Sequence, residues 1–188
     1  RRPQFSPRTL LDAGSGPGTA SWAATSAYPG ISTVTFLDNN LPFLKLASSL
    51  ASEGGHAALQ GARVLNADVS NLPGKVSAEL VIAAYALAEM PLAKARETCE
   101  HTLLVIEPGT PQGFARIHSV RISRLAAGAH LVAPCTHMNS CPMQPPDWCH
   151  FSVRLARRRG HMHAKKAKVP FEDENFSYLI AARQPGAL

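Results

Sequence analysis

Residues 9–19 read TLLDAGSGPGT, in which a short apolar run leads directly into Gly14, Gly16 and Gly18. The apolar run predicts a buried strand, and residues 19–27 predict the helix that follows the glycines. Glycines at such a place let the backbone turn sharply and lie close to a ligand, and the helix N-terminus offers unpaired N–H groups to polar ligand atoms. The stretch therefore predicts a strand–turn–helix unit with a ligand site at its turn.

Strand and helix patterns alternate along most of the chain. We expect helices at residues 19–27, 41–52, 92–100 and 113–127, and strands at residues 9–13, 31–37, 62–67, 78–87, 102–106 and 176–181. This alternation predicts βαβ units and a doubly wound, parallel α/β sheet with helices on both faces. The rhythm breaks near residue 128. We therefore divide the chain into a Rossmann-like core (1–128), a cysteine-rich and basic insertion (129–170) and a final strand with the C-terminal end (171–188).

Acidic residues follow three of the predicted strands. Asp12, Asp38 and Asp68 come at or just after the ends of the first, second and third strands, so they should meet at one edge of the sheet, where ligands of open α/β sheets bind. An acid before GxGxG resembles motif I of class I S-adenosylmethionine-dependent methyltransferases. In that pattern Asp38 would bind the ribose hydroxyls and Asp68 the adenine amino group. The expected cofactor-binding residues are Asp12, Gly14, Ser15, Gly16, Gly18, Asp38, Asn39 and Asp68.

Simpler explanations exist for the same residues. The glycines could form only a tight turn, and each Asp could cap a helix. A dinucleotide would also suit the turn and Asp38. The complete set favours S-adenosylmethionine over these alternatives.

The acceptor side of this predicted site carries little recognisable chemistry. Residues 84–91 read AYALAEMP, without the Asn-Pro-Pro-Tyr or Pro-Cys patterns of base methyltransferases. Tyr85, Glu89 and Glu107 are the polar candidates, and we favour structural roles for both glutamates. No catalytic residue is assigned.

Residues 132–151, VAPCTHMNSCPMQPPDWCHF, contain Cys135, Cys141 and Cys149. A segment so rich in Pro, His and Cys has little means of burying an apolar core. Clustered thiolates therefore predict a metal centre, either zinc or a [4Fe–4S] cluster. We disfavour disulfides, because a chain of 188 residues with 45% hydrophobic residues can bury a core of its own.

Both kinds of metal centre need a fourth ligand. Cys99 precedes the strand predicted at 102–106, at the opposite edge of the sheet from the start of the cysteine-rich segment, so it should be out of reach. His137, His150 or a residue beyond Leu188 remain as candidates.

The chain is basic, with a formal net charge of +6 and a pI near 9.5. No apolar run approaches the length of a membrane span, and we expect no membrane partner. Residues 154–168 contain no acid, and such a run is either a solvated face or a contact for a polyanion. The neighbouring cysteines favour the polyanion, so the predicted RNA-binding residues are Arg154, Arg157, Arg158, Arg159, Lys165, Lys166 and Lys168.

Together, LLDAGSGPGTASWAA, VIEPGTPQGF, LVAPC, DWCHF and PFEDENFSYLI resemble the family of methyltransferase-like proteins of the small ribosomal subunit, known in bacteria and mitochondria. The resemblance covers residues 9–183. It implies a class I methyltransferase fold, a [4Fe–4S] cluster on Cys135, Cys141, Cys149 and a fourth cysteine after the final strand, and a role in small-subunit assembly and translation. Implied partners are small-subunit ribosomal RNA and ribosomal proteins, in the mitochondrial matrix or, alternatively, the bacterial cytoplasm.

Two other functions remain open on the sequence. The first is an active S-adenosylmethionine-dependent methyltransferase of ribosomal RNA. The second is a zinc-stabilised structural protein of the ribosome.

Overall fold

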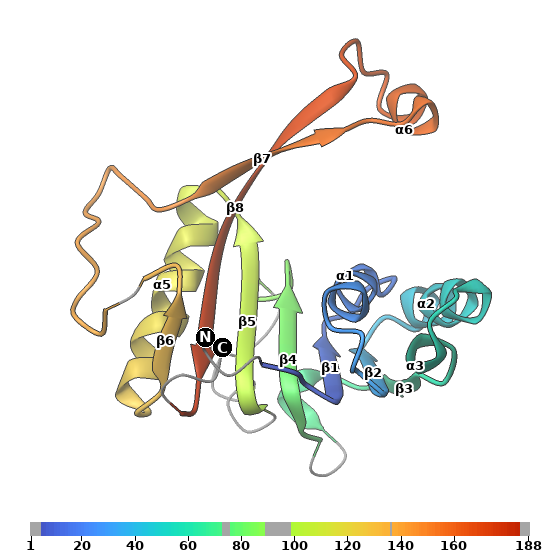
Figure 1. The fold of residues 1–188 in the computed structure, drawn as a ribbon. Coiled ribbons are helices and arrows are strands. Elements are labelled where there is room, and N and C mark those ends of the chain that lie inside the picture. Colours follow the sequence, from blue (N-terminus) through green and yellow to red (C-terminus); the bar gives the residue numbers. More distant parts are fainter. Residues whose placement is uncertain (1–4, 73–75, 89–98, 136, 185–188) are drawn as a thin grey trace.

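One mixed sheet organises the protein (Figure 1), whose computed structural model describes residues 5–72, 76–88, 99–135 and 137–184. The strand order is β3-β2-β1-β4-β5-β8-β6, and β7 pairs with β8. From β3 to β5 neighbouring strands are parallel, whereas β8 is antiparallel to both β5 and β6. The strands are β1 (Thr9–Ala13), β2 (Thr33–Asp38), β3 (Arg63–Asn66), β4 (Ala78–Ala84), β5 (Cys99–Pro108), β6 (His130–Ala133), β7 (Phe151–Ala156) and β8 (Phe171–Ala182).

Helices cover both faces of the sheet. Because side chains alternate along a strand, Leu10 and Leu11 of β1 face opposite sides and join separate apolar cores. One core lies under α1, α2 and α3, and the other lies under α5. None of the helices in the described ranges is long and apolar enough to cross a membrane. The helices are α1 (Thr19–Ala27), α2 (Leu41–Glu53), α3 (Ala57–Gln60), α5 (Pro111–Ala126) and α6 (Arg159–Ala164), with a short 3₁₀ turn, η1, at Val69–Asn71.

Most predicted elements of the core are confirmed, with shifts at their ends. The strand at 9–13 and the helix at 19–27 have the predicted bounds. β4 ends at Ala84, three residues early, because Tyr85 has a left-handed φ of 57° that a strand cannot continue. β5 begins at Cys99, so the last two residues of the helix predicted at 92–100 belong to a strand. The rest of that predicted helix lies outside the described residues.

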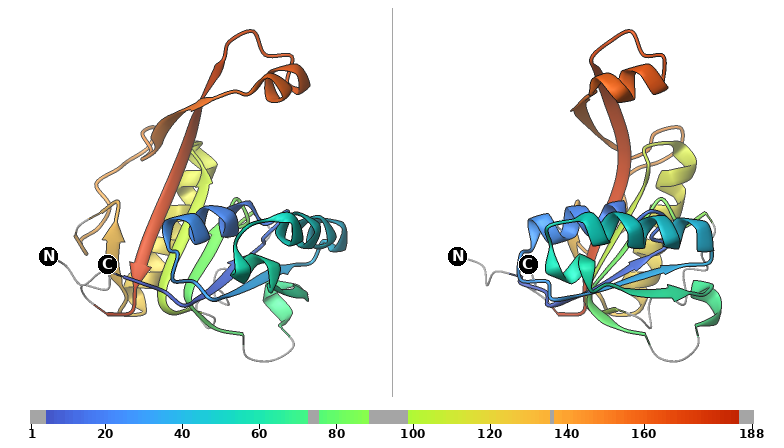
Figure 2. Two further views of the ribbon diagram at one scale, coloured as in Figure 1. Left: turned by 45° about the vertical axis from the view of Figure 1, so that its right-hand side comes forward. Right: turned by 90° about the vertical axis from the view of Figure 1, so that its right-hand side faces the viewer.

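The final strand is longer than predicted and serves two parts of the molecule. β8 runs from Phe171 to Ala182 rather than over 176–181. Its second half lies in the sheet between β5 and β6, and β6 falls inside the predicted insertion. Its first half pairs with β7, which was not predicted. Residues 151–176, called the arm below, therefore form a hairpin that projects from the body, with α6 at its tip (Figures 1 and 2).

Candidate functional site

The glycine turn after β1 is bound to the carboxyl end of β2. Gly14, Gly16 and Gly18 have φ angles of 71°, 50° and 85°, in the left-handed region that favours glycine. The Gly14 N–H donates to the carbonyl of Leu37 at 2.8 Å, and the Gly16 N–H donates to Asp38 Oδ2 at 2.8 Å. Residues distant in sequence thus form one edge of the sheet.

Asp12, at the end of β1, is a buried carboxyl group with one unpaired oxygen. Its Oδ2 accepts hydrogen bonds from the Ser21 N–H at 3.1 Å and from the Ser21 hydroxyl at 2.7 Å. Its Oδ1 has no hydrogen-bond partner in the described part of the chain. Burial raises the pKa of Asp12 to about 7, although the bonds from Ser21 oppose the shift. A polar or cationic ligand group would satisfy the unpaired oxygen.

Replacing Asp12 with Asn should remove a pH dependence of stability. The carboxyl titrates near 3.8 in the unfolded chain and near 7 in the fold. Between these values the unfolded state binds fewer protons, so the free energy of unfolding should fall as the pH rises, by up to about 4 kcal/mol. Urea unfolding from about pH 4 to about pH 7.5 measures this. In the Asn variant the free energy of unfolding should not show this fall with pH. Parallel plots of unfolding free energy against pH for the two proteins would contradict the prediction.

The ends of the strands surround a cleft of about 640 Å³. Asp38 is fixed at its rim, because its Oδ1 also accepts a hydrogen bond from the Asn40 N–H at 2.7 Å. No atom lies within 4 Å of the position that a Cβ on Gly16 would take, so the turn borders open space. Seven of the eight predicted cofactor-binding residues line this cleft: Asp12, Gly14, Ser15, Gly16, Asp38, Asn39 and Asp68.

Gly18 is the predicted cofactor-binding residue that does not line the cleft. It is the N-cap of α1, and a Cβ placed there would lie 3.1 Å from Cε1 of Phe36, in the core under α1 and α2. A glycine at residue 18 is therefore explained by the close packing of α1 against the sheet.

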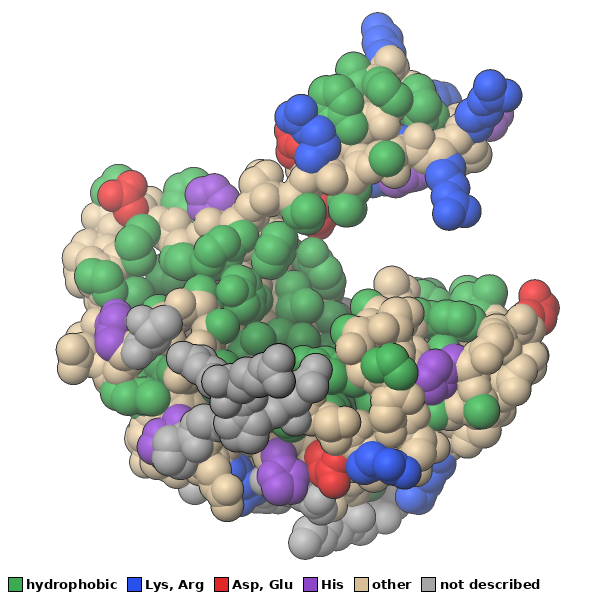
Figure 3. All heavy atoms as spheres, viewed as in Figure 1, with side chains coloured by type: hydrophobic (Ala, Val, Ile, Leu, Met, Phe, Trp, Pro, Cys, Tyr) green, Lys and Arg blue, Asp and Glu red, His purple; other side chains and the backbone are tan. Residues whose placement is uncertain are grey.

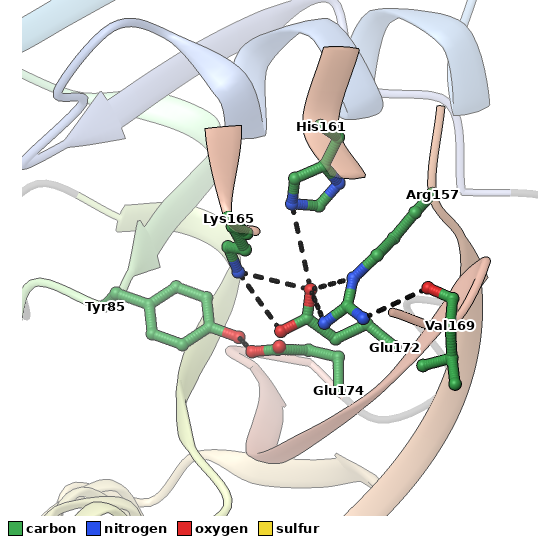
Figure 4. Close-up of polar contacts among 7 residues, drawn as sticks. All are labelled: Tyr85, Arg157, His161, Lys165, Val169, Glu172 and Glu174. Carbon is green, nitrogen blue, oxygen red and sulfur yellow. Dashed lines mark hydrogen bonds and ion pairs between the residues drawn. The ribbon is translucent and has the colours of Figure 1, made fainter. Parts of the chain in front are cut away.

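The two described polar residues on the acceptor side have different environments. Glu107 is 1% exposed, accepts a hydrogen bond from the Leu87 N–H at 3.0 Å and pairs with Arg116 at 3.0 Å, a structural arrangement as expected. Tyr85 lines the cleft, is 50% exposed and donates to Glu174 Oε1 at 3.1 Å. Partial burial and Glu174 raise the pKa of Tyr85 to about 12, so the phenol stays protonated. Tyr85 therefore joins the cleft to the arm (Figure 4), whereas Glu89 lies outside the described residues.

Residues 134–150, called the cysteine loop below, are fastened to the core at several points. Arg121 of α5 donates to the carbonyl of His137, and the Trp148 indole N–H donates to the carbonyl of Gly109 at 3.0 Å. The Ser177 hydroxyl of β8 donates to the carbonyl of Cys149 at 2.8 Å. These contacts hold Cys149 near the carboxyl edge of β5.

The three cysteines of this loop are free, partly buried thiols. Burial raises the pKa of Cys149, and charges on Cys135 and Cys141 raise it further. In the described ranges, however, no group of three or more His, Cys, Asp or Glu residues is gathered closely enough to hold a metal ion. The three thiols are thus soft donors in one short segment, without a formed set of metal ligands among the described residues.

The three residues considered as a fourth ligand have different surroundings. Cys99 pairs with Ala78 at the amino edge of the sheet, away from the loop as expected. The His150 ring stacks on Trp148, with 5.3 Å between ring centroids. The Nδ1 atom of His137 is buried and has no hydrogen-bond partner among the described residues.

Acidic residues of β8 neutralise part of the predicted RNA-binding run. Arg154 forms two hydrogen bonds with Asp173, at 2.7 and 2.8 Å. Arg157 and Lys165 both contact Glu172, each at 3.1 Å (Figure 4). The hydrogen bond from Lys165 lowers the pKa of Glu172, and Arg157 lowers it further. The run itself contains no acid, so this neutralisation depends on the pairing of β7 with β8.

The remaining cations of the run lie at the tip of the arm. Arg158 and Arg159 are at the start of α6, and Lys166 and Lys168 follow its end. All four are exposed and have no carboxylate partner in the part of the chain that the structure describes. The predicted set therefore divides into residues that hold the arm together and residues that are open to a ligand. The acids that make this division, in FEDENF at 171–176, could be seen in the sequence but not assigned to partners.

Comparison with known proteins gives a family and a fold. The family described as mitochondrial small ribosomal subunit Rsm22 matches residues 1–187. The human protein named ribosome assembly protein METTL17, mitochondrial, is 30% identical over 211 residues, which cover 97% of this chain and 43% of that protein. Rsm22-cox11 tandem protein 2, mitochondrial, of Schizosaccharomyces pombe is 30% identical over 156 residues, which cover 71% of this chain and 21% of that protein. The chain thus spans less than half the length of these relatives.

Solved structures confirm the class I S-adenosylmethionine-dependent methyltransferase fold. A methyltransferase from Aquifex aeolicus superimposes with a TM-score of 0.59 at 12% identity, over 96% of this chain and 85% of that chain. Precorrin-6y C5,15-methyltransferase from Geobacter metallireducens gives a TM-score of 0.57 at 12% identity, over 95% and 81% of the two chains. At such identities the likeness concerns the fold alone.

Proposed function

Because this chain belongs to the mitochondrial small ribosomal subunit Rsm22 family, we propose that it acts as a methyltransferase-like assembly factor of that subunit. It binds small-subunit ribosomal RNA and ribosomal proteins in the mitochondrial matrix and thereby supports translation. The human relative that is named a mitochondrial ribosome assembly protein supports this role.

The observation that carries the proposed RNA binding is the division of charge on the arm. Arg154, Arg157 and Lys165 are held by acids of β8, which stiffens the hairpin. The four open cations at the tip, Arg158, Arg159, Lys166 and Lys168, are left to neutralise phosphates. Unpaired cations at the end of this projecting arm are suited to the phosphates of a polyanion.

Sedimentation of mitochondrial ribosomal particles tests the assembly role. The full-length protein should travel with incomplete small subunits, and its depletion should lower the small subunit while the large subunit persists. A protein found only with mature small subunits would instead support a structural component of the ribosome. Unchanged levels of the small subunit after depletion would contradict an assembly role.

We also propose that the cleft binds S-adenosylmethionine. The residues fit this cofactor, because the unpaired Asp12 Oδ1 and a buried, unpaired Ser15 hydroxyl adjoin the cleft and open space lies over Gly16. Asp38 would accept hydrogen bonds from the ribose hydroxyls. The bound cofactor would supply an activated methyl group. The intact cleft is the observation that favours an active ribosomal RNA methyltransferase as a second candidate function.

Replacing Gly16 with Val should weaken S-adenosylmethionine binding by at least about tenfold, or 1.4 kcal/mol. A β-branched residue is strained at a φ of 50°, and its methyl groups would occupy the open space over the turn. Calorimetry with the cofactor measures the effect, and Gly55→Ala, which meets no atom within 4 Å, is the matched control. If ribosomal RNA from cells that carry the variant lacks one specific methyl group, the protein is an enzyme. An unchanged methylation map with weakened cofactor binding rejects catalysis.

Cys135, Cys141 and Cys149 are proposed as three ligands of a metal centre that orders the cysteine loop. Their soft thiolates suit a [4Fe–4S] cluster or zinc, and their place in one short segment that is hydrogen-bonded to β8 supports this assignment. Of the two histidines, we favour His137 as a fourth ligand within the described chain, because its buried Nδ1 has no hydrogen-bond partner there. A cysteine outside this chain is the alternative that the family resemblance implies.

Anaerobic purification of the full-length protein should yield bound metal that Cys141→Ser removes or greatly reduces. Iron and sulfide with visible absorbance would identify a cluster, whereas zinc without visible absorbance would identify a zinc site. His137→Ala should lower metal content only if this histidine is the fourth ligand. Metal content that is unaffected by Cys141→Ser would contradict the proposed centre.

A further inference from the structure

We propose that the hollow between the arm and the body binds a single-stranded segment of RNA, with phosphates at the tip of the arm and unstacked bases against an apolar wall that leads to Tyr85. The inference rests on the proposed RNA binding and adds the form of the RNA and the surface that reads it. Figure 3 shows the hollow, which has hydrophobic side chains along its inner surface and Lys and Arg side chains on the tip above it.

The wall begins with three aromatic side chains at the base of the arm. Phe151 and Phe176 are directly paired residues of β7 and β8, so they share one face, and their ring centroids are 6.0 Å apart. The ring centroid of Tyr178 lies 5.0 Å from that of Phe151 and 5.9 Å from that of Phe176. All three are only half-buried, so these rings offer faces on which bases can stack.

The same wall reaches the cofactor cleft without a break. Ala84, Ile106 and Tyr178 are paired across β4, β5 and β8, so they form one row on the sheet. Ala84 and Ile106 also line the cleft. Tyr85, one residue after Ala84, is half exposed at the rim. A base that follows the wall would therefore arrive at the phenol ring beside the cleft.

Toward the tip, the wall continues with Val153 and Leu155 of β7. Val153 pairs with Glu174 and Leu155 with Glu172, so these four side chains share a face. Since Glu174 touches Tyr85, this is the face that looks toward the body. Val153 and Leu155 are 43% and 48% exposed, and no partner within the described ranges covers them.

Charge decides which part of the RNA lies on this wall. The carboxylate of Glu174 has no cationic partner among the described residues and disfavours phosphates beside Tyr85, whereas the open cations stand at the tip, beyond Glu172. The phosphates should therefore follow the tip while the bases turn inward. Bases in a duplex are stacked and paired, and they cannot present their faces to aromatic rings. The occupant that fits both surfaces is single-stranded RNA.

Fluorescence with 2-aminopurine tests this inference on the full chain. A short RNA that carries the probe should bind at least about tenfold tighter as a single strand than when annealed to its complement, and its fluorescence should be quenched on binding. Tyr85→Leu should weaken single-strand binding by about 5- to 100-fold, relieve quenching at one probe position and leave duplex binding unchanged. Tyr85→Phe keeps the ring, loses the hydrogen bond to Glu174 and should bind as the original protein does.

The outcomes separate this inference from the function on which it rests. If neither RNA form binds, RNA binding itself fails. If both forms bind equally in a salt-dependent way, RNA binding stands and the single-strand site is wrong. An equal loss for Tyr85→Phe and Tyr85→Leu would assign the effect to the position of the arm and overturn the stacking role. A protein segment cross-linked in the hollow while RNA contacts only the tip would overturn it as well.

Discussion

Reversing the four open charges at the tip of the arm should lower affinity for a small-subunit ribosomal RNA fragment by roughly 100- to 1000-fold near 0.1 M salt, since each lost phosphate contact removes about 0.7 from the salt slope on a single strand. The variant combines Arg158→Glu, Arg159→Glu, Lys166→Glu and Lys168→Glu. Titrations at several salt concentrations measure both the affinity and its slope, which should fall by about three.

Two controls make this result specific. Lys45→Glu with Arg63→Glu reverses exposed charges on the body and should leave the slope nearly unchanged. Arg154→Glu removes a cation that Asp173 already neutralises, so it should cost less affinity than Arg158→Glu. If the body variant loses as much as the tip variant, RNA binding depends on net charge and not on the arm.

Gly113→Ala should destabilise the protein by about 3 kcal/mol or more, a loss that few single methyl groups cause. The Cβ would lie 1.9 Å from the carbonyl oxygen of Pro108, a backbone atom at the end of β5. No rotamer change can relieve the clash, because an alanine Cβ has no side-chain torsion and the Pro108 oxygen belongs to the backbone. The Gly113 N–H also donates to the Thr110 hydroxyl at 3.1 Å, which ties this turn of α5 in place. The helix would have to move away from the core beneath it.

Urea unfolding monitored by circular dichroism measures this loss, with Gly55→Ala as the control that adds a methyl group in open space. The control should unfold within about 0.5 kcal/mol of the original protein. Equal stability of Gly113→Ala and the control would show that the turn between β5 and α5 is not as the structure describes it.

The core and the cleft could be predicted from sequence because their signals are local. Glycines 14, 16 and 18 are required because three alternate positions of one turn have left-handed φ angles. Asp12 and Asp38 end strands whose apolar residues mark them clearly. Parallel strands bring those ends together in any doubly wound sheet, so the composition of the cleft followed from the order of the elements.

The arm could not be predicted in the same way. FSVRLA in β7 alternates apolar and polar residues, but it is only six residues long, mostly exposed and overlaps the basic run predicted as a polyanion contact. FEDENF in β8 contains residues that are unfavourable in strands and has no strand pattern by itself. Each is a strand because the other pairs with it, and β8 is continuous with a strand of the core. Tyr85 was predicted as an acceptor-side candidate, but its left-handed backbone and its contact with the arm were not, because they depend on Ile106 and Glu174, which lie far along the chain.

By itself, the sequence determined the α/β core, the glycine turn, the acids that border the cleft and the presence of three thiols and seven cations in one region. Only the tertiary structure decided which cations remain open, where the thiols lie and that an aromatic wall joins the arm to the cleft. The physical reason is that charge neutralisation and stacking depend on strand register. Register across β7 and β8 is set by pairs between residues up to 25 positions apart, such as Phe151 with Phe176, which no local pattern encodes.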